Sequence, residues 1–264
     1  MVGSYVDFGV KTNRRSLDVT DPREIRAACE RHRPEVILHL AAETDMDRCE
    51  REPGYAYAVN AIGTYHLAVA AKTIGATLVY VSTAGVFDGT KATAYDENDQ
   101  PAPPNTYGHS KLLGELAVRG VLDNYLIVRA CWVMGGGPKR DKKFVAKIIQ
   151  QLQNPATTEI RAVTDQVGSP TFAKDLVAAI KTLLREEQQG IFHLANTGQA
   201  SRYDEAKAII KFLRPEVTVV PITTNPDVKQ TQGGLMSLRV TSMRPWQEAL
   251  QKYLETEWKP SLRF

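Results

Sequence analysis

The sequence predicts an α/β fold, in which a doubly wound parallel sheet is followed by a smaller C-terminal lobe. Three observations predict it. Short apolar runs alternate with helical patterns through the first two thirds of the chain, the runs contain no regular polar positions, and the pattern changes after Trp132. Strands buried on both faces of a parallel sheet are apolar throughout, and helices connect them by right-handed crossovers.

Each helical pattern in the first part has recognisable ends. Acid and proline at Asp21 and Pro22 predict a helix that runs to about residue 32, because these residues favour the first turn. A longer helical pattern begins at Pro53 and ends before Gly75, a residue that favours the left-handed helix end. The remaining elements are strands over 36–42, 77–82 and 125–129 and a helix over 107–118.

After Trp132 the pattern of predicted elements changes. It predicts a loop over 135–140, a strand over 190–194, and helices over 141–152, 175–186, 201–212 and 245–253. Residues 223–234 are polar and contain glycine, which is typical of a surface loop. We expect one domain of residues 1–132 with about 165–195, and a smaller lobe of residues 133–164 and 196–264.

Composition excludes several classes of protein. The 264 residues include 33 basic and 30 acidic side chains, a balance that does not predict a nucleic-acid partner. Cys29, Cys49 and Cys131 are odd in number and far apart, so a disulfide framework or a metal site is not expected. No apolar run approaches the roughly 18 residues of a membrane helix, and the first residues do not resemble a signal peptide. These features predict a soluble cytoplasmic protein with no membrane partner.

Two short patterns predict carbonyl chemistry. Ser82 and Thr83 end a predicted strand, and ligands of parallel sheets bind at the carboxyl ends of strands. Tyr107 and Lys111 are four residues apart on a predicted helix, so their side chains are neighbours. A nearby ammonium lowers the pKa of a phenol, which then protonates the alkoxide formed when a carbonyl accepts hydride. A hydroxyl of the Ser-Thr pair would donate to that oxygen. A Tyr-x-x-x-Lys alone is common on helix surfaces, and the strand context makes it informative.

Segments along nearly the whole chain carry a family resemblance. They are residues 17–22, 40–47, 59–61, 81–89, 105–115, 165–171 and 243–250. Among them, Val81-Ser82-Thr83-Ala84-Gly85-Val86-Phe87-Asp88-Gly89 resembles the motif S-T-D-Y-V-F-D-G, and residues 105–115 match the catalytic helix. The sequence resembles the extended short-chain dehydrogenases/reductases, and within them the branch similar to dTDP-4-dehydrorhamnose reductase.

The resemblance implies a Rossmann-like fold, a C-terminal substrate-binding lobe, and an NAD(P)-dependent reductase of a nucleotide-linked 4-keto sugar in dTDP-rhamnose biosynthesis. NADP or NAD would be the cofactor and a nucleotide sugar the substrate, with a homodimer as a possible assembly. Catalysis would fall to Thr83, Tyr107 and Lys111. The cofactor would contact Asp18, Val19, Ala41, Ala42, Glu43, Thr44 and Asn60, besides Tyr107 and Lys111. The substrate would contact Ser82, Thr83, Ala84 and Trp132. No metal site is expected.

The sequence departs from this family in three places. The glycine-rich turn that holds the cofactor's pyrophosphate is missing. Either residues 2–5 are the tail of that turn, with the strand before it missing, or residues 5–10 are the second strand, with the first strand and helix missing. A truncated start, a replacement central strand and a strand from another chain would each explain this. Ala84-Gly85 stands where the branch has Asp-Tyr, and residues 227–234 lack its usual pattern. The alternative function is therefore a noncatalytic relative with weakened cofactor binding, acting as a binding or regulatory subunit.

Overall fold

A computed structural model describes residues 4–5, 16–224, 233–240 and 243–262. The chain forms two compact units. The first unit contains residues 1–87, 100–129 and 188–192, and the second contains residues 88–99, 130–187 and 193–264. These boundaries differ from the expected ones at residues 88–99 and 165–187, which cluster with the second unit. Hydrogen bonds from Tyr95 N to Gly234 O and from Met236 N to Tyr95 O hold the 88–99 segment there.

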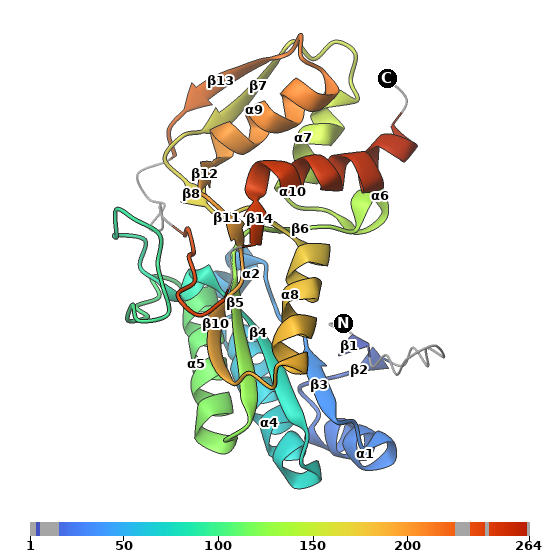
Figure 1. The fold of residues 1–264 in the computed structure, drawn as a ribbon, viewed down its shortest axis with the longest axis vertical. Coiled ribbons are helices and arrows are strands. Elements are labelled where there is room, and N and C mark those ends of the chain that lie inside the picture. Colours follow the sequence, from blue (N-terminus) through green and yellow to red (C-terminus); the bar gives the residue numbers. More distant parts are fainter. Residues whose placement is uncertain (1–3, 6–15, 225–232, 241–242, 263–264) are drawn as a thin grey trace. The chain divides into compact units, whose positions relative to one another are not determined.

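A four-stranded sheet forms the centre of the first unit (Figure 1). Its strands lie in the order β10 (Gly190–His193), β5 (Tyr125–Ala130), β4 (Thr77–Thr83) and β3 (Val36–His39). β3 and β4 are parallel. β5 is buried except at Tyr125, and β4 is buried or half-buried along its length, as their apolar sequences predicted. The chain enters β4 from one helix and leaves it toward another, as in the predicted strand–helix alternation.

Helices α1 (Pro22–His32), α4 (Gly63–Ile74) and α5 (Thr106–Val121) cover one face of this sheet. Ala68 and Ala71 of α4 and Val118 of α5 pack with Leu78 and Tyr80 of β4. α1 begins where the sequence predicted, and Asp21 caps it, since its carboxylate accepts a hydrogen bond from Arg23 N at 2.8 Å. These packing contacts fix α4 and α5 against β4, the strand that ends at Thr83.

The expectation that residues 36–42 form a strand buried on both faces is wrong. β3 ends at His39, and the side chains of Val36, Leu38 and Leu40 are 40–63% exposed. Ile37 and His39 alternate with them and face the packed side. β3 is the edge strand of the described sheet. The side chains on the face of β3 that points away from helices α1 and α4 are therefore less covered by other elements.

The helix expected over 53–74 is interrupted. It consists of α3 (Pro53–Tyr57), a π-helical turn η1 (Ala58–Ile62) and α4, which ends at Gly75 with φ 73° as expected. A helix α2 (Met46–Arg51) precedes it. π-Helical turns inside α-helices are frequent at functional sites, and this one contains Asn60.

The N-terminal segment contains a short pair of strands. β1 (Ser4–Tyr5) pairs in antiparallel fashion with β2 (Ser16–Leu17), and Leu17 packs against the cluster that contains Val19 and Ile25. The remaining residues of the strand considered over 5–10, and those before Ser4, lie outside the described residues.

The second unit combines short strand pairs with helices. β7 (Glu159–Val163) and β13 (Thr218–Ile222) run parallel, and neither was expected. The unit also contains further two-stranded sheets. They pair β6 (Val133–Met134) with β9 (Thr171–Phe172), β8 (Val167–Gly168) with β12 (Ala200–Ser201), and β11 (Asn196–Thr197) with β14 (Met243–Pro245). The helices are α6 (Gly137–Arg140), α7 (Phe144–Leu152), α8 (Ala173–Arg185), α9 (Arg202–Leu213) and α10 (Trp246–Tyr253), which the turns η3 (Leu254–Trp258) and η4 (Lys259–Ser261) follow. The expected loop over 135–140 thus contains α6, and of the expected loop over 223–234 only residues 223–224 and 233–234 are described.

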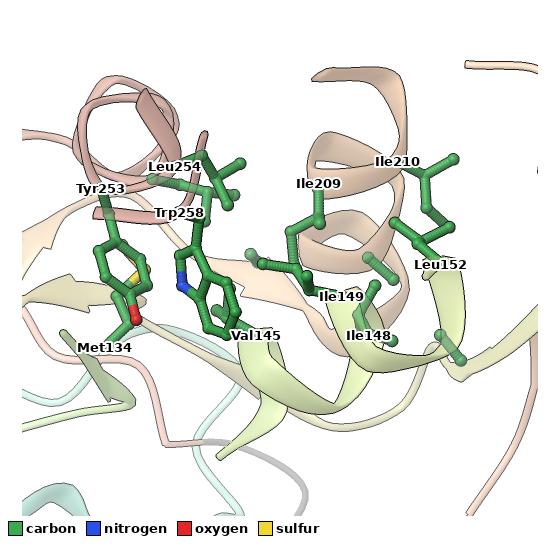
Figure 2. Close-up of a cluster of buried hydrophobic side chains, with 14 of the residues drawn as sticks. Met134, Val145, Ile148, Ile149, Leu152, Ile209, Ile210, Tyr253, Leu254 and Trp258 are labelled. Carbon is green, nitrogen blue, oxygen red and sulfur yellow. The ribbon is translucent and has the colours of Figure 1, made fainter. Parts of the chain in front are cut away.

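A large apolar cluster lies in the core of the second unit (Figure 2). Figure 2 shows side chains of α7, α9 and the C-terminal helical segment pointing into one interior, with Trp258 beside Val145. Trp246 and Trp258 are both 5% exposed. No helix among the described residues has the length and apolar character needed to cross a membrane.

Candidate active site

Thr83 and Tyr107 are neighbours in the first unit. Thr83 ends β4 and caps the turn η2 (Ala84–Val86), where its Oγ1 accepts a hydrogen bond from Gly85 N at 3.0 Å. A Cβ placed on Gly85 would lie 3.4 Å from Thr83 Oγ1 and 3.4 Å from Tyr107 Cε1. The hydroxyl and the phenol ring therefore flank the same small space beside Gly85.

The start of α5 places the Tyr107 ring. Asn105 caps the helix by accepting from Gly108 N at 2.8 Å, and the Glu50 carboxylate accepts from Thr106 N at 2.7 Å. Gly108 packs directly on the turn, because a Cβ there would lie 2.0 Å from the carbonyl oxygen of Gly85. No other residue type fits that contact without a shift of the backbone.

Lys111 lies one turn after Tyr107 and is 2% exposed. Its Nζ donates to Val81 O at 2.9 Å and lies 4.1 Å from the centroid of the Tyr80 ring. Burial lowers the pKa of Lys111 to about 7, and the charge of Glu115 opposes that shift. Its proton is therefore exchangeable near neutral pH, a useful property beside a general acid.

His39 and Tyr80 complete the polar cluster beneath Lys111. His39 Nε2 is 2.9 Å from Thr64 Oγ1, and burial, with a smaller contribution from Lys111, lowers the pKa of His39 to about 3. His39 is thus a neutral core histidine. Burial also raises the pKa of Tyr80 well above its usual value, so this phenol stays protonated.

Asn60 connects the predicted cofactor segment to the catalytic helix. Its Oδ1 accepts from Glu43 N at 2.8 Å, and its Nδ2 donates to Glu43 O at 3.0 Å and to Ser110 Oγ at 2.9 Å. Ser110 Oγ in turn donates to Tyr107 O at 2.8 Å. One amide therefore holds the backbone at residue 43 in register with the backbone at Tyr107.

Most of the other predicted cofactor residues lie in the same unit. Val19 packs with Ala41 and is 1% exposed, and a Cβ on Gly63 would lie 2.8 Å from Val19 O. Asp18 is exposed and its carboxylate accepts from Thr20 N at 2.9 Å. Ala42 is half-buried and Thr44 is exposed, and both follow the carboxyl end of β3 in the chain. Of these residues, Val19 and Ala41 are buried in the core, whereas Asp18, Ala42 and Thr44 have accessible side chains.

The Glu43 side chain is engaged by helix α2. Its Oε1 accepts from Asp45 N at 2.9 Å, and its Oε2 pairs with Arg48 Nη1 at 3.1 Å. The carboxylate of Glu43, like its backbone N–H and C=O, therefore already has partners within the protein.

Ser82 is engaged in the core. Its hydroxyl donates to Glu115 Oε1 at 2.6 Å, and the same carboxylate forms a fully buried ion pair with Arg129, with Arg129 Nη2 2.7 Å from Glu115 Oε2. Ala84 is 4% exposed. Of the Ser-Thr pair, Thr83 is the partly exposed hydroxyl beside Tyr107.

Trp132 belongs to the second unit, where it follows β5 and is partly exposed. Its φ is 41°, and the guanidinium carbon of Arg202 lies 3.4 Å from the centroid of its ring. Sequence reasoning missed this contact, which joins residues 70 positions apart. It also missed the close contact of Gly108 with Gly85, for which the position of Gly108 next to Tyr107 was the only hint in the sequence.

The donor set of the first unit fits the ribose and nicotinamide end of a dinucleotide. A phenol, a hydroxyl and an ammonium gather at the carboxyl end of β4, which is where open α/β sheets bind such ligands. A pyrophosphate cradle before residue 16 would fall outside the described residues apart from Ser4 and Tyr5.

Comparisons with known proteins agree with this geometry. The model of the family "RmlD substrate binding domain" matches residues 7–258. The spore coat polysaccharide biosynthesis protein SpsK of Bacillus subtilis is 33% identical over 254 residues, which are 93% of this chain and 88% of that protein. The dTDP-4-dehydrorhamnose reductase of Mycobacterium tuberculosis H37Rv is 36% identical, over 88% of this chain and 80% of its own.

Solved structures give the same result. The dTDP-4-dehydrorhamnose reductase of Bacillus anthracis in complex with NADP has a TM-score of 0.85 and 35% identity, over 90% of this chain and 86% of its own. The dTDP-4-dehydrorhamnose reductase of Yersinia enterocolitica has a TM-score of 0.84 and 39% identity, over 91% of this chain and 87% of its own. The Rossmann-like α/β fold predicted from the sequence is thereby confirmed. With Thr83, Tyr107 and Lys111 in place, the chain belongs to the RmlD substrate binding domain family and is a short-chain dehydrogenase/reductase-type protein similar to dTDP-4-dehydrorhamnose reductase.

Proposed function

We propose that the chain is an NAD(P)-dependent reductase that acts on the 4-keto group of a nucleotide-linked 6-deoxy sugar. The observation that carries the proposal is the placement of Thr83 Oγ1 and the Tyr107 ring around Gly85, with Lys111 one helical turn away. The names of the similar reductases supply the substrate class.

The residues divide the chemistry as follows. A bound nicotinamide would supply the hydride. Thr83 donates a hydrogen bond to the carbonyl oxygen, where negative charge develops, and Tyr107 gives that oxygen its proton. Lys111 favours the ionised phenol by its charge and offers a donor for a ribose hydroxyl. Asn60, through Ser110, keeps the start of the catalytic helix in register with residue 43.

The noncatalytic alternative is not favoured. The similar proteins named above are reductases or a biosynthetic protein, and the hydroxyl, phenol and lysine remain together in this chain. The substitution of Ala84-Gly85 for Asp-Tyr leaves the small space beside Tyr107, which affects the choice of sugar rather than the proton donor.

Turnover of dTDP-4-dehydrorhamnose with NADPH and with NADH tests the proposal. Tyr107→Phe should lower kcat by about 10²–10⁴-fold, the usual contribution of a positioned general acid, and should leave NADPH binding by calorimetry nearly unchanged. Tyr65→Phe, in an exposed tyrosine of α4, is the matched control. Absence of saturable NADPH binding by the intact chain, or full turnover by Tyr107→Phe, contradicts the proposal.

A further inference from the structure

A buried ion pair lies beside the end of β4 that carries Thr83. It joins Arg129 of β5 to Glu115 of α5, and both side chains are at most 2% exposed. The contact is bidentate, with Arg129 Nε 2.9 Å from Glu115 Oε1 and Arg129 Nη2 2.7 Å from Glu115 Oε2. A buried ion pair of this kind is often no more stabilising than apolar side chains of similar volume, and its distinctive property is a fixed geometry.

The helix that carries Glu115 also holds the end of β4. Glu115 Oε1 accepts a hydrogen bond from Ser82 Oγ at 2.6 Å. One turn earlier on the same face of α5, Lys111 Nζ donates to Val81 O at 2.9 Å. Two side chains of α5 therefore hold two consecutive residues of β4, directly before Thr83.

Arg129 contacts the chain on the other side of the turn that Thr83 begins. This segment, residues 83–87, is called the Thr83 turn below. The guanidinium carbon of Arg129 lies 5.1 Å from the centroid of the Phe87 ring, which is fully buried. The backbone N–H of Phe87 closes the turn by donating to the first residue of η2, and Gly85 N donates to Thr83 Oγ1 within it. The ion pair therefore has a contact at each end of the Thr83 turn.

We propose that the Glu115–Arg129 ion pair, together with Ser82, brackets the Thr83 turn and fixes the direction in which the Thr83 hydroxyl meets the substrate carbonyl. Ser82, Glu115 and Arg129 are then positioning residues, because they act through Thr83. Ser82 orients the turn from within the core and does not contact the sugar. This inference rests on the proposed function, which gives the Thr83 hydroxyl its task.

Ser82→Ala tests the bracket at one end. It removes one hydrogen bond to a charged acceptor and leaves both oxygens of Glu115 paired with Arg129. The kcat for dTDP-4-dehydrorhamnose should fall about tenfold, because hydrogen bonds to charged groups are among the stronger ones, and the KM for NADPH should stay nearly unchanged. The fall should be the same factor across the pH range of activity, because the variant removes no charge near Lys111.

Thr77→Val is the matched control for Ser82→Ala. Thr77 begins β4, at the end of the strand far from the site, and its Oγ1 accepts from Asn124 Nδ2 at 2.8 Å. The control removes one side-chain hydrogen bond of the same strand and should keep the wild-type kcat. A kcat within about twofold of the wild-type value in Ser82→Ala, or an equal loss in Thr77→Val, overturns the proposal.

Glu115→Leu combined with Arg129→Met separates positioning from stability. The apolar side chains fill similar volume, so the fold should keep most of its stability in urea, while kcat should stay about 10²-fold below the wild-type value. Recovery of kcat together with stability would show that the ion pair serves the fold alone and would overturn the bracket. A loss that disappears at lower pH would show that Glu115 acts by keeping Lys111 charged, and would also overturn it.

Hydrogen exchange separates this inference from the proposed function. The amides of Gly85 and Phe87 donate within the Thr83 turn, so their exchange rates report its order without substrate. Both amides should exchange about tenfold faster in Ser82→Ala and in the double variant, and no faster in Thr77→Val. If the wild-type chain does not reduce the keto sugar, the proposed function fails and the exchange rates still decide the bracket. Unchanged rates in both variants overturn the bracket even where turnover is lost.

Discussion

The contact between Gly108 and the turn after β4 offers a direct test of how the fold positions the proton donor. Gly108 is the residue after Tyr107, and a Cβ at this position would lie 2.0 Å from the backbone oxygen of Gly85 and 2.8 Å from the Pro103 side chain. Gly108→Ala therefore adds one methyl group against a backbone carbonyl, which has no rotamer through which it could move away.

The size of the effect follows from the distances. Ordinary contacts of a Cβ begin near 3.4 Å, so the first turn of α5 and the Gly85 turn must separate by about 1.4 Å. A displacement of about 1 Å in a catalytic group commonly costs about 10²-fold in rate. Overpacking of this kind also lowers the free energy of unfolding by about 1–3 kcal/mol.

The assay is steady-state reduction of dTDP-4-dehydrorhamnose, followed by the loss of NADPH absorbance, together with urea denaturation of each variant. Gly120→Ala is the matched control, because it lies on the same helix and a Cβ there would meet nothing within 4 Å. Alanine is the better helix former by about 1 kcal/mol, so Gly120→Ala should be as active as the wild type and equally or more stable.

The reasoning is refuted if Gly108→Ala keeps its kcat within about threefold of the wild-type value, because a misplacement of 1 Å should cost far more. It is also refuted if Gly120→Ala loses as much activity as Gly108→Ala. In that case helix propensity, rather than the contact with Gly85, would control the position of Tyr107.

Two further predictions concern the buried charges around the site. Burial lowers the pKa of Lys111 to about 7, well below the ~10.4 of an unfolded chain, so the unfolded state binds more protons between these values. The free energy of unfolding should therefore rise as pH rises through this window and fall as pH is lowered toward 7, and Lys111→Met should remove that slope; an identical slope in both proteins, measured by urea denaturation, would contradict the assignment. Glu115→Ala leaves Arg129 buried without its partner and should cost about 3–5 kcal/mol, whereas Glu115→Leu with Arg129→Met should recover most of the loss. A cost below about 1 kcal/mol for the single variant would show that the ion pair does not hold Arg129.

Local patterns were sufficient for much of the first unit. The cap at Asp21 and the left-handed end at Gly75 place helices that the structure contains, and the apolar runs at β4 and β5 are buried strands. Prediction was less complete in the second unit. β7 and β13 pair across 59 positions of sequence, each is five residues long, and β13 contains Pro221, a residue that weakens the signal of a strand.

By itself, the sequence determined the chemical identity of the site and the elements that carry it. The spacing of Tyr107 and Lys111 on one helix, and a hydroxyl at the end of a strand, depend only on local periodicity. The tertiary structure decided which of these groups are available. It paired Ser82 with the buried Glu115 carboxylate, left Thr83 beside Tyr107, and stacked Arg202 on the ring of Trp132. Such outcomes depend on contacts between distant segments, where desolvation and packing determine whether a polar group or a ring face remains free to meet a ligand.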